Sequence, residues 1–341
     1  VQTCALPIYP AILFFVFGMA AGLVRSDLEI PQSIAKFLSL YLLMALGLKG
    51  AFALASSGLS DSVMMSLFAA LLMASIVPAL GYAFLKSRMS KFDAAAVAAS
   101  YGSVSAVTFV TAMQYLESQQ LTVGGHMAVA MVLMESPAII MAVLMANVLR
   151  QTASQTVMVA GVSAGGAVLS STPETGRFPS IVKILHESFT NGAHLMLLAS
   201  LLIGYASGET GKAMMSPFSM DLFKGMLAFF LLDMGLMVAK NLHGLEGKSP
   251  ALLVYAAVGP VVHAVIALGL AWLLSLPLAD SVLLMVLSAS ASYIVVPAVL
   301  RYAIPEANPS IYFGLSLGVT FPMNILLGIP LYTFLAQRVL S

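Results

Sequence analysis

Long apolar stretches dominate the chain and constrain its fold more than any other feature. A helix needs about 20 mostly apolar residues to cross the hydrocarbon core of a bilayer. Strands of an outer-membrane barrel are shorter and alternate between apolar and polar residues, which these stretches do not. The sequence therefore predicts an all-α polytopic membrane protein with ten transmembrane helices, at 8–24, 34–55, 63–85, 93–114, 124–149, 190–206, 218–239, 250–275, 281–301 and 309–337.

The composition excludes several other classes of protein. Hydrophobic residues make up 60% of the 341 residues and charged residues only 9%, whereas soluble domains carry about 25% charged residues. A net charge of +1 leaves no basic surface, so we expect no nucleic-acid partner. The single Cys4 excludes a disulfide framework, and no two of the five histidines have metal-site spacing.

The distribution of lysine and arginine predicts the orientation. Eleven of the 15 basic residues lie in or beside the connections that follow the odd-numbered segments, and four lie on the opposite side. Cytoplasmic loops carry the excess of basic residues. We therefore expect a multi-pass protein of the bacterial inner membrane with both termini in the periplasm.

The two halves of the chain resemble each other. Three pairs of similar residues are 185 to 188 positions apart: Gly47 and Gly235, Asp93 and Asp280, and Pro137 and Pro322. Because each half has an odd number of segments, the second copy would be inverted, as in many secondary transporters. We expect a first five-helix repeat at 9–150, a cytoplasmic linker at 151–186 and a second five-helix repeat at 187–341.

Two segments at the repeat distance are rich in small and hydroxylated residues, Ser100–Thr108 and Ser288–Pro297. If both helices break there, the N-termini of the half-helices would offer N–H groups to a small anion at mid-membrane. Small residues at such positions also permit close helix packing, which is the alternative interpretation. The candidate substrate site comprises Gly102, Ser103, Val104, Ser105, Thr108, Ser290, Ser292 and Tyr293.

Few charged residues lie within the apolar segments, and such residues are functional candidates because burying charge in a membrane is costly. Glu135 precedes Pro137 in the fifth segment, and Thr320 and Asn324 flank Pro322 in the tenth. We expect Glu135, Thr320 and Asn324 to provide oxygen ligands for sodium or, at Glu135, a proton site. The alternative for Glu135 is a protonated acid that hydrogen-bonds a neighbouring helix.

Three further polar residues within the segments are interpreted differently. Asp233 has no counterpart in the other half, and a structural role and a role in an ion path both remain open. His263 is expected to be a core histidine. Lys49 lies near the end of its segment and is expected to extend towards the membrane surface.

Several motifs resemble the bacterial sodium-dependent bicarbonate transporter family over almost the whole chain. They are Tyr101-Gly-Ser-Val-Ser105, Met134-Glu-Ser-Pro-Ala138, Glu187-Ser188 with Gly192, and 301–310 leading to Gly328-Ile-Pro-Leu331. The resemblance implies gate and core domains, a homotrimer, bicarbonate held between two broken helices with sodium nearby, and in some members a PII-like cytoplasmic regulator. The chain departs from the family pattern at Ala106, Val107 and Tyr293, the last standing where the family has an acid.

The expected activity is therefore import of bicarbonate, or a similar small anion, coupled to sodium by alternating access. The alternatives are a proton-coupled or uncoupled anion transporter, or a channel. An intramembrane enzyme would need a catalytic pair or a Gly-x-Ser-x-Gly elbow at a strand-to-helix turn. The sequence has two Gly-x-Ser-x-Gly stretches, 161–165 and 314–318, but no predicted strand precedes either of them. We expect no enzymatic activity and no cofactor other than the sodium ion.

Overall fold

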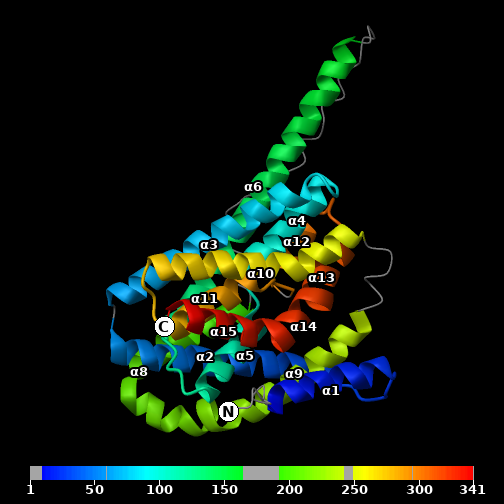
Figure 1. The fold of residues 1–341 in the computed structure, drawn as a ribbon. Coiled ribbons are helices and arrows are strands. Elements are labelled where there is room, and N and C mark those ends of the chain that lie inside the picture. Colours follow the sequence, from blue (N-terminus) through cyan, green and yellow to red (C-terminus); the bar gives the residue numbers. More distant parts are fainter. Residues whose placement is uncertain (1–9, 59, 164–191, 242–248, 294, 341) are drawn as a thin grey trace.

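The structure is a computed structural model that describes all residues except 1–9, 59, 164–191, 242–248, 294 and 341 (Figure 1). The described residues form helices and connections and contain no strand. The first half contains α1 (Pro10–Leu23), α2 (Gln32–Ser57), α3 (Asp61–Leu85), α4 (Lys91–Gly102), α5 (Ala106–Ser118) and α6 (His126–Ser163). The second half contains α8 (Gly192–Ser216), η1 (Pro217–Asp221), α9 (Leu222–Asn241), α10 (Pro250–Leu273), α11 (Leu278–Ala289), α12 (Val295–Ala303), α13 (Pro309–Leu315), η3 (Ser316–Thr320), α14 (Phe321–Met323), η4 (Asn324–Gly328) and α15 (Ile329–Leu340).

All ten predicted segments contain helix, but fewer stretches are long and apolar enough to cross a membrane. Among the described residues six meet that standard: Gln32–Ala55, Asp61–Leu85, Lys91–Ser118, Leu195–Asn241, Pro250–Leu273 and Pro309–Leu340. The number is below ten for two reasons. Leu195–Asn241 joins two predicted segments, and three apolar stretches are too short to count: the helices Pro10–Leu23 and Leu278–Ala289, and His126–Glu135, which is the first part of α6. The chain is thus a multi-pass, all-helical membrane protein.

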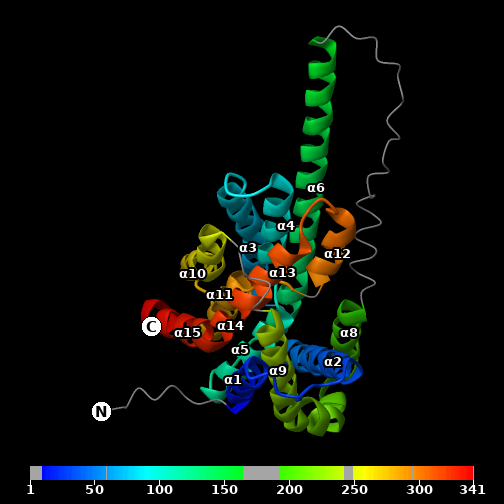
Figure 2. The same cartoon turned by 90° about the vertical axis from the view of Figure 1, so that its right-hand side faces the viewer.

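The helices form two groups that lie against each other. Figures 1 and 2 show α1, α2, α8 and α9 along the lower side of the molecule, with α3 to α6 and α10 to α15 above them. We call the first group the lower layer and the second the upper layer. Each layer contains helices from both halves of the chain, so neither half folds as a separate body.

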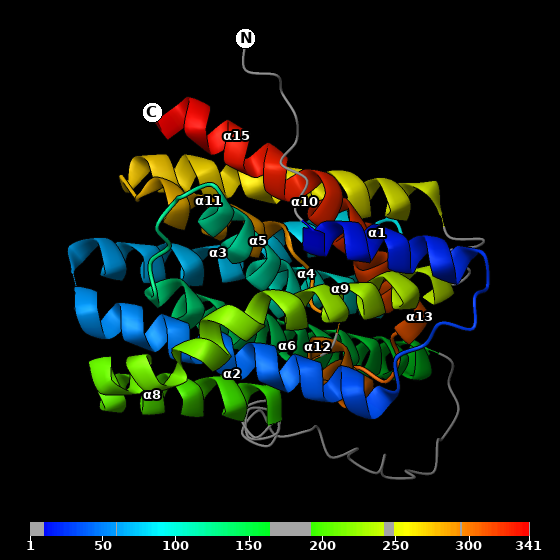
Figure 3. The same ribbon diagram turned by 90° about the horizontal axis from the view of Figure 1, so that it is seen from below.

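Glycines let α1 and α9 approach closely in the lower layer (Figure 3). A side chain at Gly18 would collide with the carbonyl oxygen of Leu232, and one at Gly235 with the carbonyl oxygen of Phe15. The two backbones therefore touch where only glycine fits, as is common in membrane helix pairs.

The other helix pair of the lower layer, α2 and α8, is packed in the same way. A Cβ at Gly47 would lie 2.8 Å from the carbonyl oxygen of Leu197, and one at Gly204 2.7 Å from the Cβ of Ala51. Gly47 is one of the residues matched between the halves, and Gly235 is its counterpart on α9. The sequence match therefore corresponds to the same type of close helix contact in both pairs.

We expect Gly235→Ala to destabilise the protein and Gly225→Ala, on the same helix, to leave it as stable or slightly more stable. Nothing lies within 4 Å of a Cβ at Gly225, where alanine favours helix by about 1 kcal/mol over glycine. At Gly235 the added methyl must push α1 away, which costs about 1–3 kcal/mol. Thermal unfolding in detergent measures both, and equal unfolding temperatures would contradict the packing argument.

Helix α6 differs from its predicted extent. The prediction placed the segment's end at 149 and a linker at 151–186, whereas α6 continues without interruption to Ser163. Figure 2 shows this helix extending well beyond the rest of the molecule. The rest of the predicted linker, from residue 164, lies outside the described residues.

Candidate functional site

The first predicted break is present between α4 and α5. Helix α4 ends at Gly102, and Ser103, Val104 and Ser105 are not helical. The Ser105 hydroxyl oxygen then caps α5 by accepting a hydrogen bond from the Thr108 N–H at 3.2 Å. Serine at the N-cap is favourable because it satisfies an N–H group that has no partner within the helix.

The second predicted break lies between α11 and α12. Helix α11 ends at Ala289, and Ser290 to Tyr293 are not helical. The Ser292 hydroxyl accepts a hydrogen bond from the Val296 N–H at 3.3 Å. Pro297 lies in the first turn of α12, where its missing N–H removes no helical hydrogen bond.

The two breaks meet and exchange hydrogen bonds. The Ser105 N–H donates to Ser290 Oγ at 2.9 Å, and Ser290 Oγ donates to the Leu287 carbonyl oxygen at 2.8 Å. In the opposite direction the Ser292 N–H donates to the Ser100 carbonyl oxygen at 2.7 Å. Ser105 matches Ser292, and Ser100 matches Leu287, at the repeat distance. We call the place where the two breaks meet the crossing. Its hydrogen bonds are nearly symmetric between the halves, except that the Ser290 hydroxyl lies between the Ser105 N–H and the Leu287 carbonyl oxygen.

The crossing is buried and contains polar atoms that lack a protein partner. All eight candidate substrate residues are buried. The hydroxyl oxygens of Ser100, Ser103 and Ser288 have no hydrogen-bond partner, and leaving such groups unsatisfied is costly. Together with the N-terminal ends of α5 and α12, these hydroxyls form a set of donors suited to a small oxyanion.

A family model described as the Na+-dependent bicarbonate transporter superfamily matches residues 10–337. The chain belongs to this superfamily. The match includes both broken helices and all helices of the two layers. A search of curated proteins found no match.

Tyr293 lies directly at the crossing, in the non-helical stretch between α11 and α12. Its hydroxyl points to the sulfur of Met234 on α9 at 3.7 Å, and its ring packs edge-on against Phe321 at 5.2 Å between centroids. The side chain thus fills space between the upper layer and α9 with an aromatic ring. A carboxylate would bring negative charge to the same place.

The two neutral residues predicted as sodium ligands already have protein partners. The Thr320 hydroxyl donates to the Ala256 carbonyl oxygen at 2.7 Å and lies 2.7 Å from the Tyr101 hydroxyl. Asn324 Nδ2 donates to the carbonyl oxygen of Ala289, the last residue of α11, at 2.7 Å. The side-chain oxygen of Asn324, Oδ1, accepts a hydrogen bond from the Tyr332 hydroxyl at 2.9 Å. Their role as sodium ligands stays a prediction that requires exchange of these hydrogen bonds.

Glu135, the charged candidate, is 8% exposed and lies in the first third of α6, which is the middle of the predicted segment 124–149. Pro137 follows within the helix and removes one backbone donor there. Among the described residues no group of three or more His, Cys, Asp or Glu side chains could hold a metal ion. A cation site at Glu135 would therefore depend on neutral oxygens from other residues.

Two aspartates matched between the halves make equivalent contacts at opposite ends of the upper layer. Asp93 Oδ1, at the start of α4, accepts a hydrogen bond from the Asn308 N–H at 2.7 Å. Asp280 Oδ1, at the start of α11, accepts one from the Gly124 N–H at 3.0 Å. Each aspartate thus ties a broken helix of one half to the connection before the last segment of the other half.

The three other polar residues within the segments have different surroundings. Asp233 is 8% exposed, and its Oδ2 has no hydrogen-bond partner. His263 is buried and packs edge-on against Tyr255, but its Nδ1 has no hydrogen-bond partner. Lys49 does not reach the surface, and that prediction was wrong. Its side chain is 12% exposed and pairs with Glu117 at 2.7 Å, a contact that the linear sequence gave no reason to expect.

An ion pair joins α6 to the connection after α12. Arg150 Nε and Nη2 each lie 2.7 Å from a Glu306 carboxylate oxygen, and Nη2 also donates to the Ala303 carbonyl oxygen at 2.9 Å. This bidentate geometry is the strongest form of such a pair. The hydrogen bond from Arg150 lowers the pKa of the Glu306 carboxyl below its ordinary value.

We expect Glu306→Gln to lower thermal stability at neutral pH and to lose this effect in acid. Because the folded pKa is lowered, the stabilisation is complete above the ordinary glutamate pKa and is lost as the pH falls through the folded value. The effect is small, since the Glu306 side chain is 37% exposed. Unfolding temperatures of wild type and variant between pH 3 and 7, about the carboxylate range, measure it. A difference independent of pH would show that the charge is not responsible.

Proposed function

We propose that the chain is a secondary active transporter that imports bicarbonate, or a similar small anion, together with sodium. The crossing of the two broken helices carries this proposal. It brings two helix N-termini and unpartnered serine hydroxyls to one buried place. Membership of the Na+-dependent bicarbonate transporter superfamily supports the same substrate and coupling ion. The activity requires no chemical step and hence no enzyme.

The architecture proposed for this function is a five-plus-five inverted repeat with a gate and a core domain. The lower layer would be the gate and the upper layer the core. Two observations support the repeat: the glycine contacts that recur in α1–α9 and α2–α8, and the matched bonds of Asp93 and Asp280. Alternating access would then be a movement of the core, with its crossing, past the gate.

Sodium is the proposed coupling ion. Sodium would bind at Glu135 with Thr320 and Asn324, after exchange of the hydrogen bonds that these two side chains make. The second candidate is proton-coupled or uncoupled transport. It is favoured by Tyr293, which places an aromatic ring where the family has an acid.

The remaining expectations concern placement and partners. The distribution of basic residues supports a bacterial inner-membrane protein with periplasmic termini, although Arg177, Lys183 and Lys248 lie outside the described residues. A homotrimer and a PII-like regulator on the cytoplasmic side remain proposals from the family resemblance alone. Membrane lipid would contact the exposed apolar side chains, such as Phe17, Leu202 and Trp272.

Flux into proteoliposomes tests the proposal. The purified protein is reconstituted, and uptake of labelled bicarbonate and of a panel of other small anions is measured with and without an inward sodium gradient. We expect uphill bicarbonate uptake that requires the gradient. Uptake driven by a proton gradient alone would favour the second candidate. Dissipative flux that no ion gradient drives uphill would indicate a channel.

A further inference from the structure

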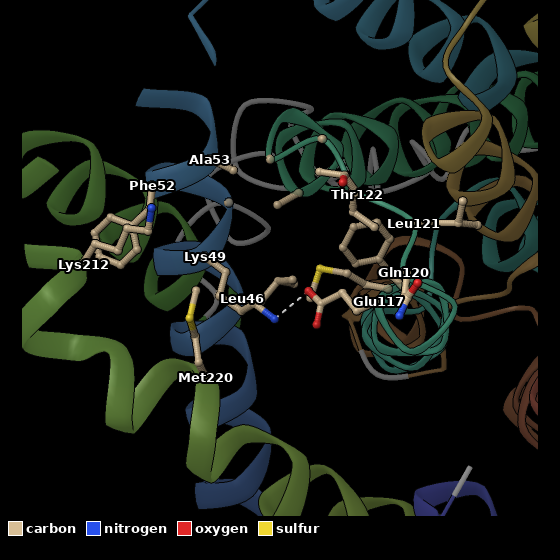
Figure 4. Close-up of a pocket in the computed structure, with 17 residues that line it drawn as sticks. Leu46, Lys49, Phe52, Ala53, Glu117, Gln120, Leu121, Thr122, Lys212 and Met220 are labelled. Carbon is tan, nitrogen blue, oxygen red and sulfur yellow. Dashed lines mark hydrogen bonds and ion pairs between the residues drawn. The ribbon is translucent and has the colours of Figure 1, made fainter. Parts of the chain in front are cut away.

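A cavity of about 450 Å³ lies between α2 and α8 of the lower layer and the end of α5 in the upper layer (Figure 4). Helix α2 lines it on one side, and the end of α5 with the connection to α6 lines it on the other. The charged side chains at this cavity are Lys49, Lys212 and Glu117. Lys212 lies 3.4 Å from the carboxylate of Glu209 on the same helix, so its charge is partly compensated. Lys49 is the less exposed of the two cations, at 12% against 40%.

Lys49 and Glu117 bridge the two layers within this cavity. Lys49, on α2, places its Nζ 2.7 Å from Glu117 Oε1 on α5. Gln114 Nε2 donates to the other carboxylate oxygen at 3.1 Å, and the Lys49 ammonium lies 5.1 Å from the centre of the Phe223 ring. The lysine is 12% exposed and its partner 33%. Lys49 is thus a partly desolvated cation, held at the cavity by a single carboxylate.

The cavity ends close to the crossing. Phe109 lines it and is 1% exposed. Phe109 lies four residues after Ser105, the N-cap of α5, which is about one helical turn or about 6 Å along the axis. Among the residues of α5 that line the cavity, Phe109 is the one nearest in sequence to the break.

We propose that this cavity is the vestibule through which the anion approaches the crossing, and that Lys49 is its first binding group. The ammonium offers three donors to a small oxyanion, and Glu117 holds the same donors until the anion displaces it. Displacement also releases the link between α2 and α5, so anion binding would loosen the contact between the layers. This inference rests on the proposed function.

Opposite effects of two substitutions test the vestibule. Lys49→Gln removes the binding group and should raise the KM for the anion at least about tenfold. Glu117→Gln removes the competitor and should lower the KM severalfold. Lys224→Gln is the matched control, because Lys224 is exposed on α9 and does not line the cavity; its KM should match wild type. If Lys49→Gln and Glu117→Gln change KM in the same direction and to the same extent, the pair is only a link between layers and the inference is wrong.

Chemical restoration of the charge keeps the test valid if Lys49→Gln folds poorly. Lys49→Cys is made in a background in which the single Cys4 is serine. Treatment with aminoethyl methanethiosulfonate adds a positive group of similar length and should return the KM towards the wild-type value. The neutral hydroxyethyl reagent should not. Equal KM values after both reagents would overturn the inference, whereas absence of anion flux in wild type would overturn the proposed function itself.

Discussion

Ser105→Leu and Ser292→Leu are expected to reduce anion uptake to background while the protein still folds and inserts. Both serines lie at the crossing, where their N–H groups bond the opposite break and their hydroxyls cap α5 and α12. Leucine adds a bulky apolar group in front of the donors and removes the hydroxyl. The anion would then contact apolar side chains in place of hydrogen-bond donors, and burying it there without hydrogen bonds is strongly unfavourable.

The matched control for these variants is Ser75→Leu. Ser75 is exposed on α3, and its hydroxyl bonds only the Leu71 carbonyl oxygen of its own helix. Uptake by this variant should equal that of wild type. Ser105→Ala separates the hydroxyl from the added bulk: loss of an N-cap costs about 1 kcal/mol, so this variant should fold and keep reduced uptake. Wild-type uptake in both leucine variants would mean that the breaks are packing surfaces only.

The sequence alone predicts the parts of this fold that depend on local chemistry. The length of the apolar stretches predicts the helices. The small and hydroxylated residues around Ser103 and Ser290 predict the two breaks, because hydroxyls and prolines favour backbone conformations other than helix. The match of Gly47 with Gly235 predicts that these two glycines occupy equivalent positions in the two halves of the chain. It does not predict that each contacts a helix from the other half, since contact partners are set by the packed structure.

Other features depend on long-range contacts and have no local signal. Lys49 and Glu117 are 68 positions apart and pair only because α2 lies against α5. The extent of α6 was missed for a local reason. The residues after Arg150 are polar enough to suggest a linker, but no proline occurs until Pro173. An established helix propagates through such residues more easily than a new one forms.

Glu135→Gln is expected to change the coupling of transport, because Glu135 is a buried carboxyl group in the middle of the predicted membrane segment 124–149. An ionised carboxylate at that depth needs a cation, since an uncompensated charge within a membrane is costly. Glutamine has nearly the same shape and mimics the protonated acid. The substitution therefore removes the charge while it leaves the packing beside Pro137 nearly unchanged.

The two candidate coupling ions give different results for this variant. If sodium neutralises Glu135, the glutamine variant loses the sodium dependence and most of the uptake. If a proton does, the variant behaves as permanently protonated, so exchange of labelled for unlabelled anion continues while uphill accumulation stops. Uptake and exchange in the same proteoliposomes distinguish these results. Glu29→Gln, at an exposed side chain in the connection between α1 and α2, is the control and should transport as wild type does. Sodium-driven accumulation that persists in Glu135→Gln would exclude Glu135 from both roles, and the coupling ion would then have to bind to neutral oxygens alone.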